Sequence, residues 1–269
     1  MASKQQIRRR KRRRNLLKIL FTLLVVAAAV ITVILLCRAR REEGQLPPQQ
    51  TAPTAPAATE PVPTEPPRSY TPDGHYIQTG LPSWELRLVN PWNPLPEDYD
   101  YEANLAVYTE NRQFDSRAMN ALRQMLAAGS DYGLWGVSLY RSYDLQVSLF
   151  NRQVARVKTA GMSEEEARAK AATVVARPGT SEHHIGLAAD ILGSGFTSLE
   201  EEFEQTPAFA WLKAHCAEYG FILRYTKEAE PITGVIYEPW HYRYVGVEAA
   251  TEIMERGITL EEYLEEKGL

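Results

Sequence analysis

Apolar and polar positions divide the chain into three stretches. An apolar run of about 19 residues without a charged side chain covers 19–37. From 44 to about 68 the chain is rich in Pro, Thr, Ala and Gln, and it has almost no large apolar side chain. Farther on, apolar residues recur at spacings typical of helices and strands. We therefore predict a basic tail at 1–18, a transmembrane helix at 19–37, a linker at 38–69 and one folded domain at 70–269.

The folded domain mixes short strands irregularly with helices. Its patterns predict helices at 116–128, 145–160, 163–175, 207–219 and 247–256, and a short one at 260–267. They predict strands at 135–140, 187–191, 221–225 and 234–237. Because the regular alternation of parallel βαβ units is missing, we expect a compact α+β domain with a small antiparallel sheet flanked by helices.

The apolar run is long enough to cross a bilayer, whose hydrocarbon core needs roughly 20 residues of helix. The alternative is a cleaved signal peptide, for which the small residues Ala27, Ala28 and Ala29 offer a cleavage site. However, the run continues past them through Leu36, which is longer than the apolar region of most signal peptides. We therefore expect an uncleaved membrane anchor.

Charge is distributed very unevenly along the chain. Residues 1–41 hold 12 of the 30 basic residues and no acidic one, which leaves 18 basic against 34 acidic residues, a net charge of -16, in the remainder. The excess of positive charge before the apolar run places the N-terminus in the cytoplasm and the domain outside the cell. An acidic domain lacks the basic footprint of a nucleic-acid-binding protein, so we exclude that class of partner.

The linker and the cysteines narrow the picture further. The stretch from 44 to about 68, which makes up most of the linker, has too few large apolar residues to bury enough surface to fold, so we expect an extended, disordered stalk. The two cysteines, Cys37 and Cys216, form no CxxC motif. A metal site in this protein must therefore use histidine and carboxylate ligands.

Two short segments carry a candidate catalytic metal site. The first runs from Ser181 to Asp190 and includes His183, and the second includes Glu238 and His241. Two imidazoles and one aspartate are suitable ligands for zinc and leave a fourth position open for water, while Glu238 is available as the base. Each motif alone is also compatible with an ordinary surface histidine, and the spacing does not establish that the two segments meet in space.

The combined pattern Ser181-x-His183-x-x-Gly186-x-Ala188-x-Asp190, followed by Glu238-x-x-His241, resembles the D-alanyl-D-alanine carboxypeptidase family of VanY type. Further matches, which extend the resemblance over about residues 85–250, are Leu88-Val89-Asn90, Asn93-Pro94-Leu95-Pro96, Tyr140-Arg141-Ser142-Tyr143, Gln146, Tyr219-Gly220-Phe221, Arg224-Tyr225 and Ile232-Thr233-Gly234. The resemblance implies a compact α+β peptidase fold. It also implies that zinc is bound by His183, Asp190 and His241, with Glu238 as general base.

The same resemblance suggests how substrate is held. Arg141 matches the family arginine that binds the scissile carbonyl or the substrate carboxylate, although a surface salt bridge is the alternative reading of this residue. Ser181 and Gln146 match positions that hydrogen-bond the terminal residue. His184 competes with His183 as a ligand, but only His183 keeps the family's spacing to Asp190.

These observations together predict a membrane-anchored zinc carboxypeptidase that removes the C-terminal D-alanine from peptidoglycan stem peptides outside the cell. Cleavage of a D,D bond is favoured. The alternatives are an L,D-carboxypeptidase acting on tetrapeptide stems, a wall-binding module that no longer turns over, and an endopeptidase acting on wall cross-links. Intact Glu238 argues against a pure binding module, because such a protein needs no base.

Overall fold

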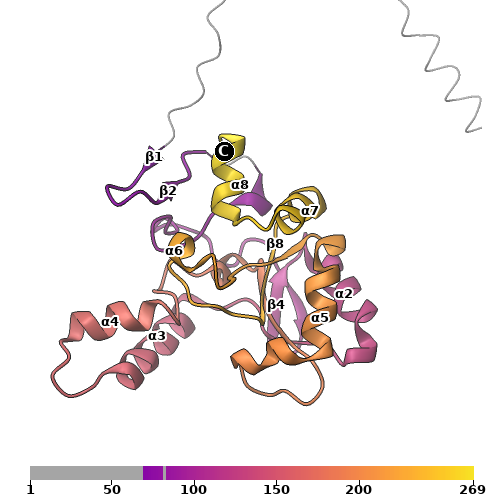
Figure 1. Ribbon diagram of the computed structural model, residues 1–269, viewed down its shortest axis with the longest axis horizontal. Helices are drawn as coiled ribbons and strands as arrows, with labels where there is room; N and C mark the ends of the chain where they lie inside the picture. Colours follow the sequence, from indigo (N-terminus) through magenta and orange to yellow (C-terminus); the bar gives the residue numbers. More distant parts are fainter. Residues whose placement is uncertain (1–68, 81–82) are drawn as a thin grey trace, which may run out of the picture. The chain divides into compact units, whose positions relative to one another are not determined.

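The computed structural model describes residues 69–80 and 83–269, and the fold is given for these residues (Figure 1). The expected compact α+β domain with small antiparallel sheets is confirmed. The predicted tail at 1–18, the transmembrane helix at 19–37 and nearly all of the linker at 38–69 lie outside the described residues. In the described part of the chain, no helix has the length and apolar character needed to span a bilayer.

Four strands form the main sheet, and every neighbouring pair is antiparallel. In the order in which they pair, they are β5 (Trp135–Ser138), β6 (Ala188–Leu192), β8 (His241–Tyr244) and β7 (Phe221–Leu223). All five residues of β6 are buried, as expected for an interior strand that is covered on both faces. The register of β6 and β8 pairs Asp190 directly with His241.

Helices cover both faces of the sheet. On one side, α2 (Met119–Ala128) and α5 (Pro207–His215) pack in the main core with β6 and with Phe221 of β7. On the other, α7 (Val247–Arg256) and α8 (Leu260–Lys267) form a second core with Ile222. Because adjacent residues of a strand point to opposite faces, Phe221 and Ile222 connect β7 to both cores.

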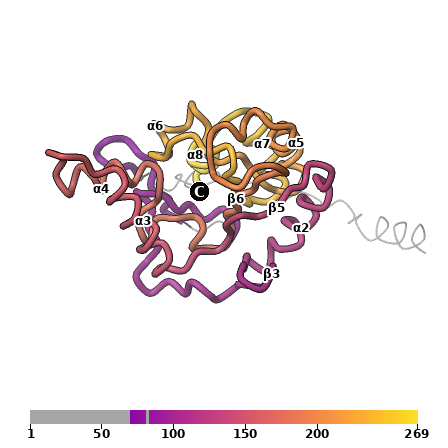
Figure 2. The backbone as a smooth tube through the Cα atoms, turned by 90° about the horizontal axis from the view of Figure 1, so that it is seen from below, coloured from indigo at the N-terminus to yellow at the C-terminus, as the bar shows by residue number. Residues whose placement is uncertain are grey.

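A helical hairpin stands apart from these two cores. Helices α3 (Tyr143–Val157) and α4 (Glu164–Ala172) pack against each other through a small core of their own. In Figures 1 and 2 this hairpin projects from the side of the domain opposite α2. Each helix begins at a serine N-cap, Ser142 or Ser163, whose side chain accepts a hydrogen bond from the first turn.

The remaining elements are short. They are β1 (Ser69–Tyr70), β2 (Tyr76–Ile77), β3 (Leu105–Thr109), β4 (Arg112–Asp115), α6 (Glu230–Thr233) and the 3₁₀ turns η1 (Trp84–Leu86), η2 (Ser130–Tyr132), η3 (Glu182–Ile185), η4 (Glu201–Gln205) and η5 (Cys216–Tyr219). The predicted helix at 207–219 therefore changes from α to 3₁₀ at Cys216. The hairpin of β3 and β4 was not predicted from the sequence.

The strand predicted at 234–237 is wrong. Helix α6 ends at Thr233, Gly234 caps it in the left-handed conformation, and the residues that follow do not join the sheet. The amide of Ile236 donates to the carbonyl of Thr173, at the end of α4, and the amide of Glu238 donates to the carbonyl of Tyr225. These partners occupy the backbone that a strand would use, so the sheet strand of this region begins only at His241.

Candidate metal centre

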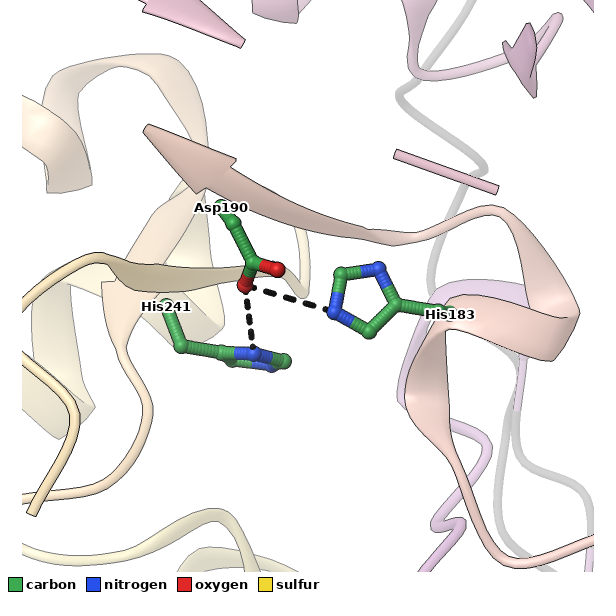
Figure 3. Close-up of side chains that lie close together, drawn as sticks. All are labelled: His183, Asp190 and His241. Carbon is green, nitrogen blue, oxygen red and sulfur yellow. Dashed lines mark hydrogen bonds and ion pairs between the residues drawn. The ribbon is translucent and has the colours of Figure 1, made fainter. Parts of the chain in front are cut away.

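Three predicted ligands come together at one end of the β6–β8 pair (Figure 3). Asp190 Oδ1 lies 3.1 Å from His241 Nδ1 and 3.3 Å from His183 Nε2. One donor atom from each of the three residues lies within 4.8 Å of the other two, and all three residues are buried. The structure therefore joins the two sequence segments that carried the candidate site.

The fold explains this convergence locally. Asp190 and His241 are cross-strand partners, and directly opposed residues of an antiparallel pair present their side chains to the same face. His183 arrives from η3, which ends at Gly186 in the left-handed conformation with φ +65°. A Cβ at Gly186 would lie 3.0 Å from the amide nitrogen of Asp115, so only glycine permits this close turn.

The hydrogen bonds of His183 leave one nitrogen available for a metal. Its Nδ1 lies 2.5 Å from the carbonyl oxygen of Leu139, which can only accept, so Nδ1 carries the proton. Its Nε2 is buried without a hydrogen-bond partner and faces Asp190. Burial, together with the nearby guanidinium of Arg141, lowers the pKa of His183 to about 4, so the ring is neutral at physiological pH. A neutral imidazole with a free, buried nitrogen is a suitable zinc ligand.

His241 uses both ring nitrogens in charged contacts. Nδ1 faces Asp190, while Nε2 lies 3.3 Å from a carboxylate oxygen of Glu182. Burial opposes protonation, but the hydrogen bonds to Asp190 and Glu182 outweigh it and raise the pKa of His241 to about 9. A cation at this position takes the place of the Nδ1 proton, so metal binding is expected to release a proton.

Glu238 lies beside the three ligands. Its Oε2 is 3.5 Å from His241 Nδ1, and the Pro239–Trp240 turn brings it there, closed by a hydrogen bond from the His241 amide to the Glu238 carbonyl. Burial, and then the negative charge of Asp190, raises the pKa of Glu238 to about 7. A carboxyl group whose pKa lies near neutrality is suited to accept and return a proton.

These groups line a cleft of about 590 Å³. Besides the ligands and Glu238, its polar lining includes Arg141 and Ser181. Its apolar lining consists of Leu149, Val174, Val175, Ala176, Leu199, Val235, Ile236 and Trp240. A cleft with a few convergent polar groups in a mostly apolar surface is typical of a small-molecule or peptide site.

Comparison with known proteins identifies the family. The family model VanY, D-alanyl-D-alanine carboxypeptidase, matches residues 111–247. The chain belongs to this family. A D-alanyl-D-alanine carboxypeptidase of Enterococcus faecalis is 42% identical over 183 residues, which are 67% of this chain and 66% of the relative. The chain therefore spans about two thirds of that relative's length.

Solved structures agree with the VanY assignment. A variant of the vancomycin-resistance D,D-pentapeptidase VanY in complex with Zn(II) is 41% identical, with a TM-score of 0.60 over 68% of this chain and 99% of that chain. The LdcB LD-carboxypeptidase is 38% identical, with a TM-score of 0.58 over 66% of this chain and 84% of that chain. The expected enzyme class, a metallo-carboxypeptidase, and the expected cofactor, zinc, are confirmed at the level of the family. A solved VanY structure holds Zn(II), and this chain has a His-Asp-His group that could bind such an ion.

Arg141 lies in the cleft beside the candidate metal ligands rather than on the open surface. One Nη donates to Asp190 Oδ2, and Nε donates to Ser138 Oγ at 2.8 Å. Its side chain is 15% exposed and lines the cleft. The surface salt bridge considered from the sequence is therefore not what the structure shows. Its role toward substrate stays a prediction.

The two predicted substrate-binding residues are placed differently. Ser181 is buried at the cleft lining, immediately before η3. Gln146 is fully buried on α3 and does not line the cleft; its Nε2 donates to the carbonyl of Ala176 at 2.8 Å. Because Val174, Val175 and Ala176 line the cleft, Gln146 supports that wall from behind. The direct contact with substrate predicted for both residues stays a prediction.

The adjacent histidines are clearly distinguished. His184 Nδ1 donates to the carbonyl of Arg141, and its Nε2 accepts from the amide of Gly179. With both nitrogens engaged by backbone groups, His184 is not part of the triad. The structure therefore brings His183, and not His184, beside Asp190 and His241, and the role of His183 as a metal ligand stays a prediction.

Sequence reasoning missed Glu182. Although burial raises the pKa of its carboxyl, the guanidinium groups of Arg224 and Arg243 lower that pKa well below its usual range. The signal for this residue was slight, namely an acidic side chain directly before a candidate ligand. Its partners lie 42 and 61 residues farther along the chain, so no local pattern indicates them.

Proposed function

We propose that the chain is a zinc-dependent carboxypeptidase that removes the C-terminal D-alanine from peptidoglycan stem peptides, with a preference for the D,D bond. The observation that carries the proposal is the buried triad of His183, Asp190 and His241, with Glu238 beside it, at the base of a cleft that also contains Arg141. Zinc, when bound by the triad, supplies a Lewis acid that polarises a carbonyl and acidifies water.

Glu238 moves the proton in this proposal. It accepts a proton from the attacking water and later donates that proton to the leaving amine, so the net reaction adds water across the amide bond. A pKa near neutrality lets the same carboxyl group perform both transfers. Its turn between Tyr225 and His241 fixes its position relative to the triad.

Arg141 binds substrate in this proposal. The guanidinium group has five N–H donors, and those that bind Asp190 and Ser138 leave others for the cleft. Its positive charge is suited to the terminal carboxylate of a peptide or to the oxyanion that develops on the scissile carbonyl. Contact with the terminal carboxylate would restrict the enzyme to the last residue of the stem.

The bond that is cut needs a direct test. A D,D-pentapeptidase and an LD-carboxypeptidase resemble this chain almost equally, at 41% and 38% identity. Purified full-length chain in detergent, loaded with zinc, is to be incubated with a pentapeptide stem ending in D-Ala-D-Ala and with a tetrapeptide stem. Mass spectrometry should show faster loss of one alanine from the pentapeptide. Faster loss from the tetrapeptide would establish the L,D alternative, and no loss from either would overturn the proposal.

A blocked substrate distinguishes exopeptidase from endopeptidase action. If the terminal carboxylate is required, the pentapeptide amide should be cut far more slowly than the free acid. Equal cleavage of the two would favour the endopeptidase.

We also propose that the domain works outside the cell on a membrane tether. The support is the charge-free apolar run at 19–37 and the basic residues that precede it. Protease added to intact cells should remove the domain, and cell fractionation should recover the full chain with membranes. Protection of the domain in intact cells would contradict this arrangement.

A further inference from the structure

Behind the metal centre, four charged side chains form a buried ion cluster of Glu182, Arg224, Arg243 and Glu261. The side chains are between 0% and 4% exposed. Arg224 donates from Nε to Glu182 Oε1 at 2.7 Å and from its two Nη atoms to both oxygens of Glu261 at 2.7 and 2.8 Å. Arg243 Nη1 lies 3.0 Å from the same Glu182 oxygen.

The two arginines contact only one of the two carboxylate oxygens of Glu182. Both guanidinium groups engage Oε1, whereas Oε2 lies 3.3 Å from His241 Nε2. Two acids and two arginines balance in charge, so Glu182 is an ionised carboxylate and can only accept a hydrogen bond. His241 Nε2 must therefore carry a proton, and the other nitrogen, Nδ1, is the one that faces Asp190 and the metal position.

We propose that Glu182 is a positioning residue for the metal centre: it fixes the tautomer and the ring orientation of His241 so that Nδ1 is presented to the metal. The proposal deepens the proposed function, since it concerns the same zinc site. A carboxylate that accepts from the remote nitrogen of a ligand histidine orients the ring and makes it a stronger ligand.

The two histidine ligands are held by different means. His183 is oriented by a backbone carbonyl, that of Leu139, whereas His241 is oriented by the Glu182 side chain. Glu182 and His183 are neighbours in η3, so one turn supplies a ligand and also the acceptor that orients a second ligand. The two arginines hold Glu182 in turn, which gives its carboxylate a fixed direction.

A purely structural role is the competing explanation, because Glu182 also neutralises buried arginines. Glu261 provides the matched control. It is buried in the same cluster and pairs with the same Arg224, but its other hydrogen-bond partner is Asn90 and not a metal ligand. E182Q and E261Q each remove one buried negative charge, and only E182Q changes the acceptor of His241.

The experiment measures zinc binding rather than activity alone. Full-length wild type, E182Q and E261Q are compared by competition with a chromophoric zinc chelator, by thermal unfolding, and by nitrogen NMR of the histidine rings in the zinc-loaded state. We expect E182Q to bind zinc about 10–100-fold more weakly and to shift the ring-nitrogen signals of His241. E261Q should keep the wild-type zinc Kd within about twofold, even where its Tm falls.

Folded E182Q with an unchanged zinc Kd and unchanged His241 signals would overturn the proposal, as would equal weakening by E261Q. If E182Q does not fold, the charge-balanced double variant E182Q/R243Q takes its place, compared with R243Q alone, and the same loss of affinity is expected. Wild type that binds zinc but releases no alanine would refute the proposed function and leave this inference standing. Wild type that releases alanine while E182Q binds zinc normally would refute only the inference.

Discussion

The cleft has two sides that are built very differently. The metal side is formed by β6, β8 and η3, whose side chains are buried between two cores and connected to the buried ion cluster. The helical wall is formed by α3 and the turn that follows α4, which contribute Leu149, Gln153, Arg156, Val174 and Val175 to the lining. That hairpin has a small core of its own, centred on Phe150 and Val154.

The difference separates chemistry from recognition. Ligand positions depend on strand register and on buried charge pairs, which do not adjust gradually. The helical wall depends on a few apolar contacts, so its shape can change without moving the metal. The similarity of this chain to both a D,D-pentapeptidase and an LD-carboxypeptidase is consistent with a constant metal side and a variable wall. The following predictions test this division, beginning with the largest effect.

Removal of a ligand on the metal side should abolish the site. In Asp190→Asn, the amide loses the charge that holds zinc and pairs with Arg141. We expect zinc content to fall to near zero and alanine release to become undetectable, as measured by metal analysis and mass spectrometry. Asp131→Asn, at an exposed position, is the control and should match wild type. Full zinc content in Asp190→Asn would show that the triad is not the metal site.

Removal of the base should separate turnover from metal binding. Glu238→Gln keeps the shape of the side chain but cannot accept a proton, so kcat/KM should fall by about 10²–10⁴-fold. Zinc content should stay near the wild-type level. Exposed Glu228→Gln serves as the matched control. Near-normal turnover in Glu238→Gln would remove the mechanism, and loss of zinc would make Glu238 a ligand.

The pH profile should report the same carboxyl group. Burial raises the pKa of Glu238 to about 7, and its base form is the ionised one, so activity should decrease as pH falls through that pKa. The positive charge of bound zinc lowers this pKa, which places the midpoint of the acid limb of kcat/KM below about 7. Below the midpoint, the rate should fall about tenfold per pH unit. An acid limb centred above 7.5 would indicate another group.

The smallest effects are expected from one substitution in the core of the α3–α4 hairpin and one in the main core. Phe150→Leu in the helical wall and Phe221→Leu in the main core each replace a fully buried aromatic ring with a smaller side chain. Each should cost on the order of 1–2 kcal/mol of stability, as measured by denaturant unfolding. Phe150→Leu should raise KM while the zinc Kd stays within about twofold. If Phe150→Leu raised the zinc Kd by as large a factor as it raised KM, the metal side and the helical wall would not be independent.

The sequence predicted the site better than the sheet. His183 and Asp190 were recognisable because Gly186 and the spacing between the two residues are local features of one short segment, whereas His241 was assigned from the resemblance to the VanY family. Helices α7 and α8 have their predicted bounds because glycines end both, and a capping box at Thr259 and Glu262 starts α8. The predicted strand at 234–237 failed because its backbone partners, Thr173 and Tyr225, come from distant segments that no local pattern reveals.

The same limit explains the missing Glu182 and the hairpin of β3 and β4. The importance of Glu182 depends on Arg224 and Arg243, which reach it only in the folded domain. Strand β3 is largely half-buried or exposed, so it lacks the clean apolar alternation that marks a strand in a sequence. What could not be predicted from the sequence was which distant segments pair with one another, rather than the type of residue at each position.

The pairing of Asp190 with His241 also governs when the centre can form. His183 and Asp190 lie within one short stretch, but the third donor is 51 residues away and arrives only when β8 docks on β6. In the unfolded chain only two of the three donors are close together, whereas the native chain holds all three at one place. The ion therefore binds the native state more tightly and stabilises it selectively. During refolding, zinc can therefore bind to all three donors only after β8 has paired with β6. A chelator that removes zinc should lower the melting temperature, even where no catalysis is measured.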